Sequence, residues 1–376
     1  MASESTRRSS LRNVVFFAVL VGSLGTGCAT EKPLIENHQK RTTNPLLAKA
    51  KRPLERDLIE TLEELRKRHR IPGLQVRVEK IDEPIFDVAL GARSGDQQET
   101  VTANDSWSLA SQTEILTAVL IGQAIERTNL TWQSRIGQVL KNEIPERIPL
   151  HASTRAITVD QLLSHQAGLL SPSKIRGGEL WAASKRSDLP MQDIRLRLAR
   201  GILASPLEFA PGTRTAYSES AYIVLGHIAE IVFQSPWEKL VQNRIFTPLA
   251  MKSCGFVATG TVHCSAQDWA KFLRIFFDDG DSRTWRAKIL RKDTLDHLIA
   301  SAGNGMTFMS MQKIDRRSWA KGPVYLMAGN GATSHSISAV APKASLAITI
   351  NTNFGGRDAE VGTQEILKLL ESRIDN

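Results

Sequence analysis

The chain has 376 residues, of which 41% are hydrophobic, and a formal net charge of +9. This length and composition allow one large domain or a domain with an inserted lobe, and the absence of a repeat of fixed period excludes a solenoid. No basic stripe alternates with aromatic residues, so nucleic-acid binding is not expected. We interpret the positive charge as solvated helix faces and linker. Attraction to an anionic membrane or cell-wall polymer is the alternative.

Residues 1–28 have the pattern of an export signal. The basic stretch TRRSSLRN precedes the apolar stretch VVFFAVLVGSLGTG, which at about 14 residues is too short to span a bilayer comfortably. An uncleaved N-terminal anchor is the alternative to a cleaved signal. The paired arginines resemble a twin-arginine signal, so the sequence leaves the export route open.

Cys28 follows small residues, and the segment GTGC resembles the lipobox of a bacterial lipoprotein. This resemblance implies lipidation of Cys28, which would hold the protein on the periplasmic face of a bacterial membrane. Ala29, in place of an aspartate, favours the outer membrane if the cell has one. Residues 29–52 are polar and charged without a clear period, which predicts a flexible tether between membrane and domain.

Two further cysteines, Cys254 and Cys264, follow Cys28 in the chain. An exported protein enters an oxidising compartment, where this pair can form a disulfide. Two buried free thiols are the alternative, because the sequence does not give the distance between the two residues.

The predicted domain, residues 53–376, begins with a helix and two strands. Pro53 opens an amphipathic helix with one stripe of leucines, and Pro72-Gly73 ends it. Residues 73–80 and 84–91 alternate apolar and polar side chains, which predicts two half-buried strands that pair as a hairpin.

Helical patterns dominate from Ser111 to about residue 298. After the apolar run that follows Ser111, we predict helices at 157–168, 220–233 and 265–277. Two strands, at 334–342 and 345–353, and an amphipathic helix at 358–374 then complete the chain. This order predicts an α+β fold, in which the first and last helices flank an antiparallel sheet and an all-helical lobe is inserted at about residues 112–300.

Several local strings, together with this order, resemble the serine β-lactamase superfamily, and within it the class C β-lactamases, their penicillin-binding relatives and related esterases. The resemblance extends over roughly residues 54–376 and implies the β-lactamase/transpeptidase-like fold. The strings are IPGLQVRV (71–78), SLASQTEILTAVLIGQAIE (108–126), ITVDQLLSHQAGL (157–169), FAPGTRTAYSESAYIVLGHIAEIV (209–232), IFTPLAM (245–251) and VAPKASLAITINTN (340–353).

The resemblance implies three catalytic motifs, and each is altered here. The Ser-x-x-Lys motif matches Ser111 to Glu114, so the serine is present but a glutamate replaces the lysine that would accept its proton. The Tyr-x-Asn motif matches Tyr217 to Glu219, which keeps the tyrosine and loses the asparagine. The best match to the Lys/His-x-Gly motif is Gly329-Asn330-Gly331, which lacks the cationic or imidazole side chain.

The stretch from Ser111 to Glu114 also has the pattern of a helix capping box. In that interpretation the Ser111 hydroxyl accepts from the Glu114 backbone N–H, the Glu114 carboxylate accepts from the Ser111 N–H, and neither residue is catalytic. We interpret His165 as a packed structural histidine. Arg214 and Lys321 are the candidates to supply the missing positive charge, and the sequence does not decide whether either does.

The function predicted from these residues follows from their charge. Glu114 and Glu219 place negative charge where the family's site receives a substrate carboxylate and an oxyanion. We therefore predict a β-lactamase-related protein of the cell envelope that is impaired in catalysis and binds peptidoglycan or an envelope protein. The alternative is an active β-lactamase, D-Ala-D-Ala peptidase or esterase that is acylated on Ser111. No cofactor is expected, and no metal site, because no nearby His or Asp has ligand spacing.

Overall fold

The computed structural model describes most of the chain after residue 52. Residues 1–44 and 45–376 form two separate units, and the first unit lies outside the described residues. The export signal, Cys28 and the tether at 29–52 also lie outside them and stay predictions. Within the described part, no helix combines the length and the apolar character needed to cross a membrane. The described ranges are 53–81, 83–93, 99–141, 150–185, 188–257, 260–278, 285–303 and 306–375.

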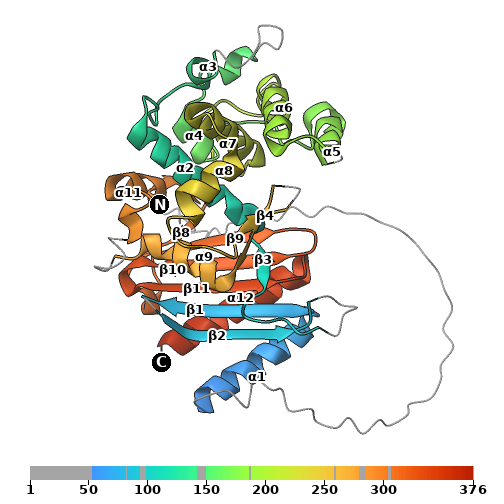
Figure 1. The fold of residues 1–376 in the computed structure, drawn as a ribbon, viewed down its shortest axis with the longest axis vertical. Coiled ribbons are helices and arrows are strands. Elements are labelled where there is room, and N and C mark those ends of the chain that lie inside the picture. Colours follow the sequence, from blue (N-terminus) through green and yellow to red (C-terminus); the bar gives the residue numbers. More distant parts are fainter. Residues whose placement is uncertain are drawn as a thin grey trace, which may run out of the picture. The chain divides into compact units, whose positions relative to one another are not determined.

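An antiparallel sheet of eight strands, in the order β2-β1-β11-β10-β9-β8-β7-β6, forms the lower half of the ribbon in Figure 1. The strands from the two ends of the domain meet in its interior, where Leu74 of β1 pairs with Thr352 of β11. The bounds are β1 Gly73–Lys80, β2 Glu83–Gly91, β6 Ser301–Gly303, β7 Met306–Thr307, β8 Gln312–Ile314, β9 Val324–Asn330, β10 His335–Ala341 and β11 Leu346–Thr352.

The first and last helices, α1 (Pro53–Arg68) and α12 (Arg357–Asp375), cover one face of this sheet. Leu62 of α1, Ile366 of α12 and Ile350 of β11 belong to one buried apolar cluster. Burial of these stripes is the main force that holds the helices on the sheet. The predicted flanking of the sheet by the two terminal helices is confirmed.

The opposite face of the sheet is covered as well, by α9 (Ala266–Leu273), which contacts β1 and β11. The prediction that β1 is half-buried is therefore wrong. Its polar residues Gln75, Arg77 and Glu79 are only 0%, 6% and 1% exposed. A buried charge is tolerated when it is paired, and the Arg77 guanidinium lies 2.7 Å from the Glu79 carboxylate and also pairs with Asp87.

A helical lobe lies above the sheet, as Figure 1 shows, and confirms the predicted α+β architecture. The range 112–300 is not all helical, however. Before α9 the chain forms strands β4 and β5, which belong to a small sheet in the order β3-β5-β4. The lobe's helices are α2 Thr113–Arg127, α3 Ile136–Val139, α4 Val159–Leu163, α5 Glu179–Lys185, α6 Met191–Leu203, α7 Glu219–Phe233, α8 Trp237–Val241 and α11 Lys292–Ile299. The small strands are β3 Ser106–Ser108, β4 Gly255–Phe256 and β5 Val262–Ser265.

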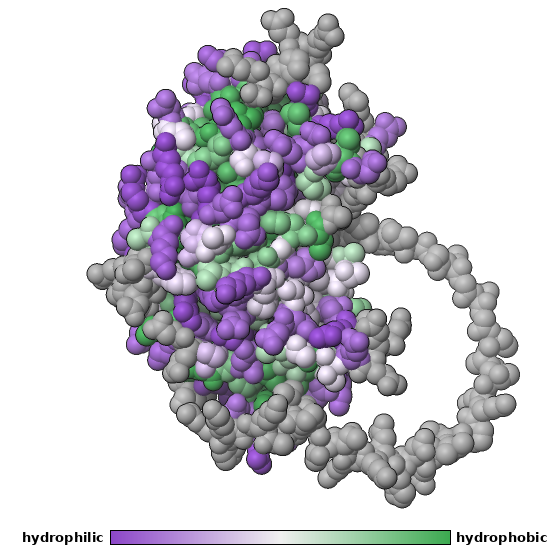
Figure 2. Space-filling view, in the orientation of Figure 1, coloured by the Kyte–Doolittle hydropathy of each residue, from purple (hydrophilic) through white to green (hydrophobic). Residues whose placement is uncertain are grey.

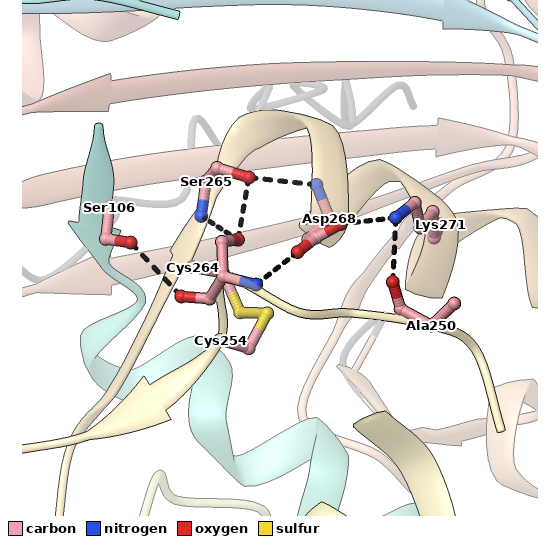
Figure 3. Close-up of a disulfide and its surroundings, with 8 residues drawn as sticks. Ser106, Ala250, Cys254, Cys264, Ser265, Asp268 and Lys271 are labelled. Carbon is pink, nitrogen blue, oxygen red and sulfur yellow. Dashed lines mark hydrogen bonds and ion pairs between the residues drawn. A yellow bond between two sulfur atoms is a disulfide. The ribbon is translucent and has the colours of Figure 1, made fainter. Parts of the chain in front are cut away.

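Cys254 and Cys264 are joined by a disulfide beside this small sheet (Figure 3). Of the two alternatives that the sequence left open, the structure contains the bonded pair. Around it, the Ser253 and Ser265 hydroxyls lie 2.8 Å apart, and the Ser265 hydroxyl accepts from the Asp268 N–H as the N-cap of α9. The disulfide therefore holds the chain where it passes from the lobe to the helix that covers the sheet.

Candidate active site

Ser111 lies on a single turn of 3₁₀ helix, η1 (Ala110–Gln112), between β3 and α2. This turn packs against β9 at Gly329, where a Cβ atom would stand 2.1 Å from the Leu109 carbonyl oxygen. Only a glycine permits so close an approach of two backbones. The Gln112 side-chain amide donates to the Ser336 hydroxyl of β10 over 2.7 Å. The sheet thus fixes the position of the serine.

The alternative interpretation of Ser111 to Glu114 as a helix capping box does not hold in the structure. Gln112 is the N-cap of α2 and makes no side-chain capping bond. The Glu114 carboxylate instead accepts two hydrogen bonds of 2.6 Å each, one from the Tyr217 hydroxyl and one from the Ser310 hydroxyl. The Glu114 carboxylate is therefore bound by side chains that are distant in sequence and not by the backbone N–H of Ser111.

A chain of hydrogen bonds continues from Glu114 into the lobe through His165. The Ser218 N–H donates to His165 Nδ1 over 3.1 Å, so the ring proton is on Nε2. Nε2 lies 2.9 Å from the Ser310 oxygen and donates to it, which leaves the Ser310 proton for Glu114. His165 is fully buried and paired, in agreement with a structural histidine, but it also orients a partner of Glu114.

Ser111 contacts this network through Tyr217. The tyrosine hydroxyl oxygen lies 3.3 Å from Ser111 Oγ and 2.6 Å from Glu114 Oε1. The phenol is the donor in both contacts, and its one proton serves the shorter bond to the carboxylate better than the longer one to the serine. Among the described residues that line the cavity there is no lysine to supply an amine beside Ser111.

Ser310 was missed by the sequence analysis. It lies in the turn between β7 and β8, at a φ of 63°, a left-handed conformation that is uncommon for a residue other than glycine. The Thr307 hydroxyl stabilises this turn by accepting from the Met309 and Met311 N–H groups. Ser310 belongs to no motif and is 196 residues from Glu114 in sequence, so no local signal could have identified it.

Burial dominates the electrostatics of the site. It raises the pKa of Glu114 to about 7, although the hydrogen bonds from Ser310 and Tyr217 lower it, and the charge of Glu219 raises it further. Burial lowers the pKa of His165 to about 4, so the imidazole is neutral at pH 7. Although Tyr217 is 56% exposed, its pKa is raised by desolvation of the hydroxyl beside Glu114 and then by the charge of Glu114, so this tyrosine stays a phenol.

Replacement of Glu114 by glutamine is expected to stabilise the protein at pH 8 and to have little effect at pH 5. The folded carboxyl holds its proton more tightly than the unfolded one, so the wild type loses stability as pH rises from about 4.5 through about 7. The loss amounts to about 1–3 kcal/mol. Urea unfolding at both pH values measures the difference. The exposed Glu60→Gln is the control, and a gain for Glu114→Gln that does not depend on pH would contradict the assignment.

Ser111 and Tyr217 open onto a cavity of about 210 Å³. Gln112, Ile115 and Ser310 also line it, as do residues of β9, namely Leu326, Met327 and Ala328. Asn330 and Gly331, the binding residues predicted at the end of β9, are not among the lining residues. The residues of this strand that face the cavity are Leu326, Met327 and Ala328, and none of them is charged.

The remaining candidates lie outside this cavity. Glu219 is the exposed first residue of α7 and acts on the site through its charge. The guanidinium of Arg214 lies over the ring of Phe209, 4.3 Å from its centroid. Lys321 follows Trp319, which is buried in the cluster beneath α1 and α12. Neither cation replaces the missing lysine.

The described residues contain no group of three His, Cys, Asp or Glu side chains arranged to hold a metal ion. The chemistry available at the cavity is therefore that of a serine hydroxyl, a phenol and a buried carboxyl group.

Comparisons with known proteins agree with this fold. The chain is 24% identical to penicillin-binding protein 4 of Amycolatopsis lactamdurans over 192 residues, which are 51% of this chain and 46% of that protein. The chain thus spans less than half the length of this curated relative.

Two solved structures share the fold. The octameric penicillin-binding protein homologue of Pyrococcus abyssi has a TM-score of 0.68 at 17% identity, over 84% of this chain and 77% of the other. The β-lactamase/D-alanine carboxypeptidase of Pseudomonas syringae has a TM-score of 0.63 at 16% identity, over 84% of this chain and 99% of the other. The family model of the β-lactamases matches residues 58–371. With a serine, a tyrosine and a sheet strand around one cavity in that fold, this protein belongs to the serine β-lactamase superfamily.

Proposed function

We propose that this protein acts at the bacterial cell envelope, that acylation of its Ser111 is impaired, and that its cleft binds peptidoglycan without cleaving it. One observation carries the proposal. The carboxylate of Glu114, held by Tyr217 and Ser310, occupies the place where the family's motif has an amine.

Impaired acylation follows from the groups around the serine. The Tyr217 hydroxyl, whose oxygen is 3.3 Å from Ser111 Oγ, lies as a donor to the serine and to Glu114, so it is not oriented to accept the serine proton. The cavity is lined by no Lys, Arg or His side chain within the described part of the chain, so a developing oxyanion meets no positive charge there. Electrostatic stabilisation of that kind is usually a large part of catalysis.

The envelope location is supported by the sequence of residues 1–28 and by the disulfide between Cys254 and Cys264, which suits an oxidising compartment. Lipidation of Cys28 would hold the protein on the periplasmic face of a membrane, within reach of the wall. Peptidoglycan as the ligand is supported by the names of similar proteins, which include a penicillin-binding protein and a D-alanine carboxypeptidase.

A second candidate function is a slow serine hydrolase. The observation that favours it is that the Tyr217 hydroxyl lies within hydrogen-bond distance of both Ser111 Oγ and the Glu114 carboxylate. In this mechanism the serine proton passes to the tyrosine oxygen while the tyrosine proton passes to the carboxylate, and the serine oxygen attacks the substrate carbonyl.

Intact-mass spectrometry of the full chain after incubation with a penicillin and a p-nitrophenyl ester separates the two functions. We expect no adduct on the wild type or on Ser111→Ala, and equal sedimentation of both with purified cell-wall sacculi. The hydrolase predicts an adduct on the wild type that Ser111→Ala abolishes. That adduct, or wall binding that depends on Ser111, would overturn the first proposal.

A further inference from the structure

A second cavity, of about 510 Å³, lies in the helical lobe and shares no lining residue with the Ser111 cavity. Four cationic side chains line it, and no Asp or Glu does. Figure 2 shows a strongly hydrophilic surface over the region of α2, α8 and α11. The four cations are Arg127, Lys239, Arg244 and Lys288. We call these four residues the cationic cluster.

No member of the cationic cluster forms an ion pair in the described part of the chain. Two of them lie over aromatic rings instead: Arg244 is 3.8 Å from the centroid of Phe233, and Lys288 is 4.4 Å from that of Trp285. Burial lowers the pKa of Arg244, and the charge of Arg127 lowers it further, so these two guanidinium groups repel each other. A bound anion would relieve this repulsion.

The walls of the cavity are held in place by Gln123, a buried residue of α2. Its side-chain amide donates to the Arg244 carbonyl over 3.3 Å and to the Ile289 carbonyl over 3.0 Å. It thereby ties the chain at Arg244 to the chain beside Lys288. Arg244 itself lies in a π-helical turn, η4 (Gln242–Phe246), and such turns occur frequently at functional sites.

The ends of helices account for only part of the cationic cluster. α2 ends at Arg127 and α7 ends at Phe233, and a cation near a helix C-terminus is stabilising by itself. That argument covers Arg127, and it also covers Lys239 and Arg244, which lie in the last turns of α8 and η4. It does not cover Lys288 in the segment before α11, and it does not explain why cations from different elements converge on the same space.

We propose that this cavity is a binding site for a phosphate-bearing ligand, with the guanidinium groups of Arg127 and Arg244 as its principal partners. Arginine binds phosphate oxygens in a planar, two-pronged geometry. Four positive charges match a ligand with two or more negative charges, and the cavity volume falls in the range of small-molecule sites. The site takes the phosphate of a soluble ester or that of a lipid headgroup, which present the same chemistry.

Isothermal titration calorimetry of the full chain with inorganic pyrophosphate at low ionic strength tests this site. We expect saturable binding that Arg244→Gln and, separately, Lys288→Gln weaken by roughly tenfold or more. The matched control is Arg214→Gln, which removes an arginine that also lies over a phenylalanine ring but outside the cavity. Absence of saturable binding, or equal weakening by the control, would overturn the proposal.

Two further measurements sharpen the result. Without pyrophosphate, Arg244→Gln should unfold at the same temperature as the wild type or higher, because repulsion is removed; a lower temperature would assign Arg244 a structural role instead. Sedimentation with phosphatidylglycerol/phosphatidylcholine vesicles distinguishes the ligand sources. Vesicle binding that pyrophosphate displaces and Arg244→Gln weakens identifies a headgroup, and pyrophosphate binding alone identifies a soluble phosphate.

Discussion

The variant Glu114→Lys is expected to acylate Ser111 with a penicillin or an activated ester on the order of 10²-fold faster than the wild type, or more. The substitution restores the Ser-x-x-Lys spacing on a serine that the sheet already holds beside Tyr217. Burial lowers the pKa of a lysine, which produces the neutral amine that can accept the serine proton. The negative charge of Glu219 and the Ser310 hydroxyl make the position tolerant of an ammonium group.

Stopped-flow release of p-nitrophenol together with intact-mass spectrometry measures this gain. Glu114→Gln is the matched control, because it removes the carboxylate charge without supplying a base, and we expect it to stay as slow as the wild type. The double variant Ser111→Ala/Glu114→Lys must show no adduct. Equal acceleration by glutamine and lysine would mean that the charge of Glu114, and not the lack of an amine, limits the wild type.

The variant Glu79→Ala is expected to lose about 3–5 kcal/mol of unfolding free energy. Glu79 is 1% exposed and pairs with two arginines, Arg77 of β1 and Arg274 at the end of α9. Without this carboxylate, two arginines lose their shared partner between the sheet and the helix that covers it. Asp87 cannot replace Glu79, because it already pairs with Arg77 and burial raises its pKa.

Urea unfolding followed by circular dichroism gives this difference directly. The control is Asp296→Ala, which removes an exposed pair between Asp296 and Lys292 and should cost less than about 1 kcal/mol. A loss for Glu79→Ala as small as that of the control would mean that solvent reaches the arginines beneath α9.

The parts of the fold that sequence predicted well are those with long, regular patterns. The alternation in residues 73–80 and the stripes of the two terminal helices gave bounds within a few residues of the structure. The short strands β6, β7 and β8 escaped prediction, because strands of two or three residues carry no measurable period. The predicted helix at 157–168 ends at Leu163, and His165 then takes a left-handed φ of 57° that no local signal announces.

Less of the candidate site than of the fold could be predicted from the sequence. Ser111 and Tyr217 were identified because each lies in a motif that resembles the family's. The hydrogen-bond partners of Glu114 were not identified, because the sequence from Ser111 to Glu114 fits a capping box as well as it fits a network formed by the tertiary fold. The β7–β8 turn, which brings Ser310 to Glu114, decides between the two. The cavity-lining part of β9 was also missed, because Gly329-Asn330-Gly331 was chosen by its resemblance to a motif, whereas the tertiary fold brings Leu326, Met327 and Ala328 to the cavity.

The position of Glu114 also has a genetic consequence. Glutamate and lysine codons differ only in their first base, so one transition would place an amine beside a serine that is already positioned by Gln112, Ser336 and Gly329. Cells that carry this gene are thus a single base change away from the family's catalytic pair.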